Sequence, residues 1–185
     1  MAATTTNREA RRPRTKAGFS LIELLIVIAI ILIIAAIAIP NLIRSRMAAN
    51  EASAAGHIRA MATAATVYSA TWDNGYPPSL TAMGGSGLVA TCNNALLLDP
   101  VMTTAPFHKG GYTFSYTGVG PTILTTGPGC GAPGFNAYLT AATPISVGFT
   151  GNRSFCSDLP GVIHFDPTGA AISSVGACDA LAVLQ

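Results

Sequence analysis

The feature that most constrains this chain is an apolar run from Phe19 to Ile39, long enough to cross a membrane. As an α-helix it would extend about 31 Å at about 1.5 Å per residue, close to the ~30 Å hydrocarbon core of a bilayer. Only Ser20 and Glu23 in this run are polar, and no polar side chain lies between Leu24 and Ile39. The run therefore predicts one membrane-spanning helix near the N-terminus.

A basic segment precedes the apolar run. Residues 1–18 carry five basic side chains and one acidic one, a net charge of +4, whereas residues 19–185 have a net charge of −2. Because Lys and Arg are retained on the cytoplasmic side of a membrane, we expect residues 1–18 to be cytoplasmic. A nucleic-acid-binding arm would show the same charge. An arm attached directly to a membrane span has little reach, so we expect no nucleic acid as a direct ligand.

The possible processing site lies before the apolar run, in the reverse of the order found in a secretory signal. A secretory signal has an apolar region of about 7–15 residues followed by a small-residue cleavage site. Here the small residues, in Lys16-Ala17-Gly18, come before the apolar run. Cleavage after Gly18 would leave the hydrophobic segment attached to the mature protein.

Glu23 is an acid within the predicted span. An ionised acid in such a place costs about 3 kcal/mol on insertion scales and calls for a partner. Cutting the Gly18–Phe19 bond would create an α-ammonium group one helical turn from the Glu23 carboxylate. Alternatively, Glu23 lies near the interface and is stabilised by the dipole at the helix N-terminus. Physical reasoning leaves both interpretations open.

The run Lys16–Val27, with its continuation to Pro40, closely resembles the type III signal of type IV prepilins and of type II secretion pseudopilins. The likeness combines a charged leader, the Gly18–Phe19 junction, the lone acid Glu23 and the terminal proline. It implies that a prepilin peptidase cuts after Gly18 on the cytoplasmic face and N-methylates Phe19. It also implies that Glu23 contacts the Phe19 amine of an adjacent subunit during filament assembly.

The chain departs from this family at Leu32, where many members have a glycine that is linked to helix unwinding in filaments. Because Gly costs about 1 kcal/mol relative to Ala within a helix, Leu32 should hold the helix more firmly. Pro40 still removes a backbone donor and obstructs the preceding turn. We therefore expect any kink or unwinding to centre on Pro40.

The helical period continues after Pro40. Apolar side chains recur at spacings of three, four or seven, which predicts an amphipathic helix whose stripe packs on a sheet. They are Ile43, Met47, Ala54, Ile58, Met61, Ala65, Tyr68 and Trp72. The sequence from Asp73 to Pro78 ends this helix with several breakers together.

Beyond the helix, residues 73–110 are expected to form an irregular connection with one short helix around Asn94–Leu98. Strand-like runs separated by Gly/Pro turns follow. They are Tyr112–Thr117, Asn136–Ala141 and Gly161–Asp166, with weaker candidates at Thr122–Thr126 and Ile145–Phe149. The predicted fold is therefore α+β, with a long N-terminal helix packed on a small antiparallel β-sheet, which agrees with the pilin fold.

These elements predict five segments. The expected order is a cleaved leader (1–18), a transmembrane and assembly helix (19–40), its amphipathic half (41–72), a connecting loop (73–110), and the antiparallel sheet with the C-terminal disulfide region (111–185).

Four cysteines follow the apolar run, namely Cys92, Cys130, Cys156 and Cys178. None forms C-x-x-C, which argues against a zinc ribbon. An even number in an exported, turn-rich domain predicts two disulfides in an oxidising compartment, with three pairings possible. By the family resemblance we favour Cys156–Cys178 and Cys92–Cys130, the first closing the C-terminal region as in the disulfide-bonded loop of many pilins.

We expect no catalytic, cofactor or metal site. His164 and Asp166 would share one sheet face, but two ligands do not make a metal site. The stretch 84–87 (Gly-Gly-Ser-Gly) lacks the Lys-Ser/Thr of a phosphate loop, and no nucleophile elbow is present in the sequence. The chain is therefore not expected to be an enzyme or to have a small-molecule substrate.

The resemblance implies a structural subunit of a type IV pilus, polymerised through its N-terminal helix and serving adhesion, motility or DNA uptake. The implied partners are other copies of the chain, the prepilin peptidase/N-methyltransferase and an inner-membrane assembly platform. The precursor would cross the inner membrane once with a periplasmic head, and later form an extracellular filament. The alternatives are a pseudopilin of a type II secretion apparatus and, from another class, a membrane-tethered binding protein or enzyme.

Overall fold

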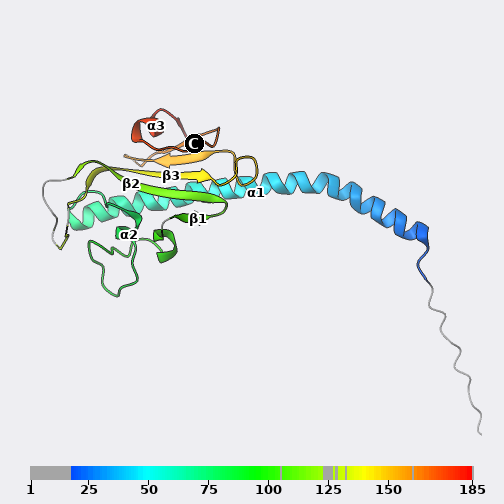
Figure 1. The fold of residues 1–185 in the computed structure, drawn as a ribbon, viewed down its shortest axis with the longest axis horizontal. Helices are drawn as coiled ribbons and strands as arrows, with labels where there is room; N and C mark the ends of the chain where they lie inside the picture. Colours follow the sequence, from blue (N-terminus) through cyan, green and yellow to red (C-terminus); the bar gives the residue numbers. More distant parts are fainter. Residues whose placement is uncertain are drawn as a thin grey trace, which may run out of the picture. The chain divides into compact units, whose positions relative to one another are not determined.

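The computed structural model of this chain describes residues 18–104, 106–122, 127, 129–131, 133–159 and 161–184. The chain divides into two units, Met1–Asn41 and Leu42–Gln185. The elements in chain order (Figure 1) are α1 (Leu21–Trp72), α2 (Leu80–Met83), the 3₁₀ helix η1 (Pro100–Thr103), β1 (Phe107–Lys109), β2 (Tyr112–Thr122), β3 (Phe135–Pro144), β4 (Ser154–Ser157), β5 (Ile163–Asp166), α3 (Val175–Asp179) and β6 (Ala182–Val183).

The first unit consists of the first part of α1. This part of the helix is long and apolar enough to cross a membrane, and no side chain of its most apolar 18-residue window is buried. Leu24 and Ile37, for example, are exposed over more than half of their surface. Continuous exposed apolar surface of this length suits a lipid or protein environment and is costly in water.

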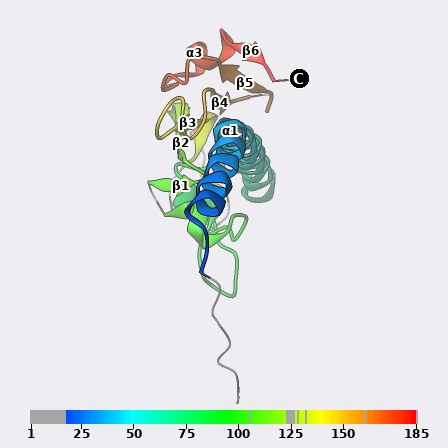
Figure 2. The same cartoon turned by 90° about the vertical axis from the view of Figure 1, so that its right-hand side faces the viewer.

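The second unit contains a six-stranded antiparallel sheet in the order β1-β2-β3-β4-β5-β6. Each strand pairs with the next one along the chain, and Figure 2 shows the strands stacked in that order beside α1. The last 31 residues of α1, from Leu42 to Trp72, belong to this unit and supply one layer of its core. The predicted α+β class is confirmed.

The core between α1 and the sheet pairs small helix side chains with large sheet side chains. From α1 come Ala54, Ala55, Ile58, Met61, Ala62, Ala64 and Ala65, and from the sheet come Phe107, Tyr112, Phe114, Tyr138, Ala142, Phe155 and Ile163. Alanine needs little room, so the helix can approach the sheet closely and the aromatic rings fill the space between them.

The opposite face of the sheet is covered by the C-terminal segment. Leu139 and Ala141 of β3 lie there with Cys156, Ile172 and Cys178. Strand β3 is therefore buried on both faces, and residues 138–142 are buried without interruption.

The sequence predicted β2, β3 and β5 but not β1, β4 and β6. The runs 112–117, 136–141 and 161–166 each fall on a strand of the structure, β2, β3 or β5. Of the candidate Thr122–Thr126, Thr122 ends β2 and residues 123–126 lie outside the described residues. Strands β1 and β6 were missed because they have three and two residues, too few to show a period, and β4 because its four residues are all buried and do not alternate.

The candidate strand at Ile145–Phe149 was wrong. This segment is a tight turn, in which the Thr150 amide donates to the Ser146 carbonyl and the Gly148 amide to the Gly151 carbonyl. Its apolar side chains gave a strand-like pattern, yet Ile145 and Phe149 are exposed.

The short helix expected at Asn94–Leu98 was also wrong, because the helix of this region is α2. Residues 95–98 instead run beside the end of α2 and donate their amides to Ala82, Met83 and Gly84 carbonyls. Leu96 takes a positive φ of 55°, which an α-helix does not allow.

A buried acid joins α1 to the start of β4. The Glu51 carboxylate accepts hydrogen bonds from the Asn152 amide (2.8 Å) and the Arg153 amide (3.3 Å). Its other oxygen accepts from Arg153 Nε at 2.7 Å, and the guanidinium group lies over the rings of Phe155 and Phe165. Three donors therefore satisfy one buried carboxylate across a hundred residues of sequence.

Replacing Glu51 by Ala should destabilise the second unit by about 1–3 kcal/mol, because it leaves two backbone donors and one guanidinium donor without their acceptor. Denaturant unfolding of the whole chain in detergent, followed by the fluorescence of Trp72, would measure the change. Arg59→Ala, at an exposed position of the same helix, is the matched control and should stay within about 0.5 kcal/mol of wild type. Equal midpoints for the two variants would contradict this account.

Candidate processing and assembly site

The predicted cleavage junction lies in exposed, non-helical backbone. Gly18, Phe19 and Ser20 precede α1, and the Phe19 side chain is 88% exposed. A methyl group at Gly18 would meet no atom within 4 Å, and Gly18 does not have a positive φ. Within the described part of the chain, neither packing nor backbone conformation requires glycine at this position.

Glu23 caps the first turn of α1. Its Oε2 accepts a hydrogen bond of 2.9 Å from the backbone amide of Ser20. Ser20 immediately precedes the helix, so Glu23 is the third helical residue, and this contact is one half of a capping box. The carboxylate satisfies a helix N-terminal donor and also lies where the helix dipole favours negative charge.

This capping contact was missed by the sequence analysis, although a signal was present. Ser20-Leu21-Ile22-Glu23 is an S-x-x-E pattern immediately before an apolar run, the usual signature of a capping box. The contact supports the interpretation in which Glu23 is stabilised by the N-terminus of the helix. One carboxylate offers about four acceptor positions, so the cap leaves room for a cation.

Pro40 lies inside α1, at the end of the first unit. Its ring removes one backbone donor from the helix. The missing donor favours a kink at Pro40, which stays a prediction.

The two disulfides join Cys92 to Cys130 and Cys156 to Cys178. This is the favoured pairing of the three that four cysteines allow. The second bridge connects β4 with α3 and lies in the core on the outer face of the sheet.

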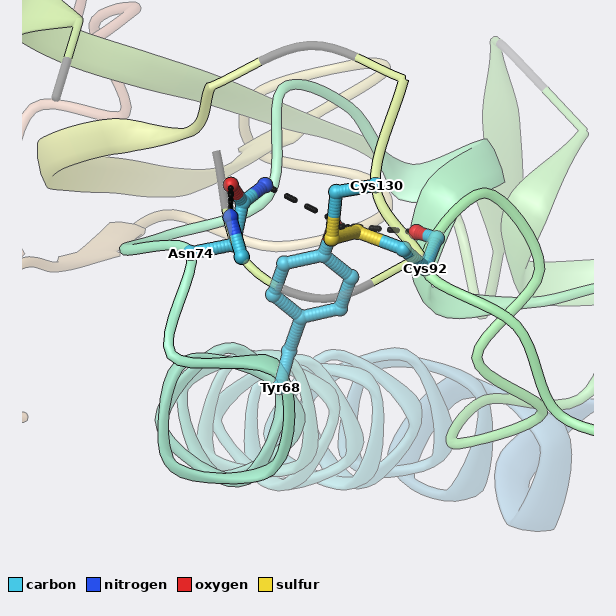
Figure 3. Close-up of a disulfide and its surroundings, with 5 residues drawn as sticks. Tyr68, Asn74, Cys92 and Cys130 are labelled. Carbon is cyan, nitrogen blue, oxygen red and sulfur yellow. Dashed lines mark hydrogen bonds between the residues drawn. A yellow bond between two sulfur atoms is a disulfide. The ribbon is translucent and has the colours of Figure 1, made fainter. Parts of the chain in front are cut away.

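The Cys92–Cys130 disulfide is held against the end of α1 (Figure 3). The Tyr68 hydroxyl donates to the Cys92 carbonyl oxygen at 2.9 Å and lies 2.8 Å from Cys92 Sγ. The Asn74 side chain donates to the same sulfur at 3.6 Å and accepts from the Gly127 amide at 2.9 Å. These contacts fasten the long connection after α1 to the helix itself.

The pair His164 and Asp166 does not form a site. Both residues lie on β5, but Asp166 accepts from the backbone amide and the hydroxyl of Thr168 at 2.8 Å each, closing the turn that follows the strand. His164 instead donates from Nδ1 to the Leu181 carbonyl at 2.9 Å.

Comparisons with known proteins agree with this geometry. Residues 13–39 match the family model of the prokaryotic N-terminal methylation motif. The chain is also 40% identical over 81 residues to the type IV wide pilus major component PilA4 of Thermus thermophilus. That alignment covers 44% of this chain and 61% of PilA4, so the chain spans less than two thirds of its relative. No solved structure matches the chain.

The methylation motif and the exposed apolar part of α1 fit a membrane-anchored subunit of a pilus filament. Residues 13–39 therefore carry a prokaryotic N-terminal methylation motif, and part of the chain is similar to a type IV pilin.

The cap predicts a local effect of Glu23 substitutions. In Glu23→Ala the Ser20 amide loses its acceptor and should exchange its hydrogen about 2- to 30-fold faster, the range expected for loss of a helix cap. Glu23→Gln keeps an amide oxygen that can accept the same bond, so its exchange should stay near wild type. Hydrogen exchange of the detergent-solubilised chain tests this, with the buried Ala55 amide as internal reference. Unchanged exchange in Glu23→Ala would contradict the cap.

Proposed function

We propose that this chain is a structural subunit of a type IV pilus, made as a membrane-anchored prepilin. The observation that carries the proposal is the methylation motif over residues 13–39, which coincides with the exposed apolar part of α1. The partial relative PilA4 is named as the major component of a wide pilus, which supports a filament role. The role is structural, so catalysis is not part of it.

The first step of this function is processing by a prepilin peptidase at the Gly18–Phe19 bond, followed by N-methylation of Phe19. Two features support it. The junction is exposed and non-helical, so a peptidase could bind its backbone without unwinding the helix. Gly18 has no neighbouring atom within 4 Å of an added Cβ, so the space beside it is open to an outside partner.

Processing predicts a defined mature protein. Intact-mass analysis of the chain recovered from its producing cells should show loss of residues 1–18 and gain of one methyl group. Gly18→Leu should insert and fold as wild type because the position is open, yet it should stay uncleaved. Gly56→Leu, another open and exposed glycine further along α1, controls for a general effect of added bulk and should be cleaved normally. A mature chain that starts elsewhere, for instance after Ala38, would refute the prepilin assignment.

The second step is polymerisation through the N-terminal helices. Cleavage gives Phe19 an α-ammonium group at the helix end where the Glu23 carboxylate already lies. In a bundle of helices with little water, this ammonium needs a counter-charge, and the Glu23 carboxylate of a neighbouring subunit supplies it. Other copies of the chain and an inner-membrane assembly platform are then its partners.

Two substitutions separate this role from simple capping. Glu23→Gln retains a cap acceptor but no charge, whereas Glu23→Ala retains neither. Charge pairing predicts that both lose sheared filaments by at least about tenfold, since breaking a buried pair typically costs about 3–5 kcal/mol. Insertion and processing should remain, because an uncharged residue enters a membrane more easily. Normal filament yield from Glu23→Gln at matched expression would leave Glu23 as a helix cap alone.

The anchor and the head divide between compartments in this proposal. Residues before Phe19 would be cytoplasmic, the first part of α1 would cross the inner membrane, and the disulfide-bonded second unit would be periplasmic until assembly. Two disulfides in the second unit suit an oxidising compartment. Adhesion, motility and DNA uptake are the activities such a filament would serve.

The alternative is a pseudopilin of a type II secretion apparatus, which shares the same processing and assembly chemistry. Location separates the two. A pilus subunit should be abundant in filaments sheared from the cell surface, whereas a pseudopilin should remain in the envelope fraction.

A further inference from the structure

Three side chains of types that can bind a metal ion lie close together in the second unit. Asp158 follows β4 directly, His164 lies on β5, and Asp179 is the last residue of α3. One donor atom from each of the three lies within 4.8 Å of the others. This cluster plays no part in the processing and assembly site.

Asp158 is buried without a compensating partner. Its residue is 1% exposed, and neither carboxylate oxygen has a hydrogen-bond donor among the described residues. A buried carboxylate beside a second acid is unfavourable unless a cation or a proton lies between them.

The Leu181 carbonyl fixes the tautomer of His164. Its Nδ1 lies 2.9 Å from the Leu181 carbonyl oxygen, which can only accept, so the hydrogen of this bond is on Nδ1. In the neutral ring this leaves the lone pair on Nε2. Metal-binding histidines usually donate their other ring N–H to a carbonyl or carboxylate in this way, which fixes the tautomer and the ring orientation.

The cluster is both held in place and open to solvent. Cys156 and Cys178 form the disulfide that links the segment of Asp158 to the segment of Asp179, with a Cα–Cα distance of 6.0 Å. Asp179 is exposed and His164 is partly exposed, so an ion can enter from solvent. A site whose ligands are already positioned binds with less loss of conformational entropy.

We propose that Asp158, His164 and Asp179 bind one divalent transition-metal ion of the Zn²⁺ type. An imidazole nitrogen with two carboxylates suits such ions, whereas Ca²⁺ takes six to eight oxygen ligands and Mg²⁺ retains its waters. Three protein ligands leave a position for water. The bound ion neutralises the buried Asp158 and ties α3 to β4 and β5, beside the Cys156–Cys178 bridge.

This proposal departs from the sequence expectation of no metal centre. In the sequence, His164 was paired with its neighbour Asp166, and that pair was too small to make a site. In the structure, two acids from outside β5, Asp158 and Asp179, lie near His164. Sequence spacing alone does not predict that they are neighbours.

The test uses the detergent-solubilised full chain with oxidised disulfides, and Zn²⁺ as the probe in equilibrium dialysis near neutral pH. Wild type should bind one Zn²⁺ per chain, and Zn²⁺ should raise its thermal unfolding midpoint. Asp179→Asn and His164→Gln should each weaken binding by at least about 10-fold, since the loss of even a supporting contact typically costs that much. Asp179 is exposed, so its variant should keep the wild-type circular dichroism.

The matched controls are Asp166→Asn and His108→Gln, an acid and a histidine outside the cluster, which should bind Zn²⁺ as wild type does. The proposal is overturned if wild type shows no saturable Zn²⁺ binding, or if Asp179→Asn and His164→Gln bind as tightly as wild type. Displacement of Zn²⁺ by equimolar Ca²⁺ would overturn the assignment to a transition metal. None of these measurements depends on pilus assembly, so the metal site and the proposed function fail or stand separately.

Discussion

The second unit depends on one contact, the packing of an alanine-rich helix face against a row of phenylalanines that crosses the sheet. The register places Phe107 opposite Phe114, Phe114 opposite Ala142, Ala142 opposite Phe155, and Phe155 opposite Phe165. Because directly opposed residues share a face, this row forms one continuous surface toward α1. Burying each large ring contributes about 1.5–3 kcal/mol as an upper estimate. Ala142 is the small member in the middle of the row. A large side chain at this position would leave no room for the helix.

Polar contacts fix the position of the helix along that row. Near the start of the part of α1 that packs on the sheet, Glu51 accepts from the backbone amides of Asn152 and Arg153 and from the Arg153 guanidinium group, which also lies over the rings of Phe155 and Phe165. Near the C-terminal end of α1, the Tyr68 hydroxyl donates to the Cys92 carbonyl oxygen and so fastens the long connection after α1 to the helix. Apolar packing has little directional preference, so a smooth alanine face could slide along the sheet. Directional hydrogen bonds to buried groups make one register more favourable than its neighbours.

Elements whose hydrophobic pattern continues over many residues could be predicted from the sequence. Contacts set by the register of the strands could not. The helix ends at Trp72, directly before the breakers that begin at Asp73, and residues 112–117 of β2 alternate between more buried and more exposed positions. Strand β4 has four consecutive buried residues and so no alternation to recognise. The Ser20–Glu23 cap is local and was readable as S-x-x-E. The neighbourhood of Asp158 and Asp179 is not local, because it arises from a disulfide and from two strand registers.

Under the proposed function, the cap would allow one acid to serve both before and after processing. In the precursor, Glu23 accepts the Ser20 amide, so an acid that would be costly in an apolar helix has a partner before assembly begins. In the proposed function, cleavage at Gly18 would remove the basic leader and place a positive charge next to this same turn. The carboxylate can accept both the amide and an ammonium group, since the two use different lone pairs. The cap therefore holds the carboxylate at the helix end, and only the new amine has to arrive for a subunit to acquire its counter-charge. On this account, processing controls assembly by creating the positive partner, while the negative one is in position from the start.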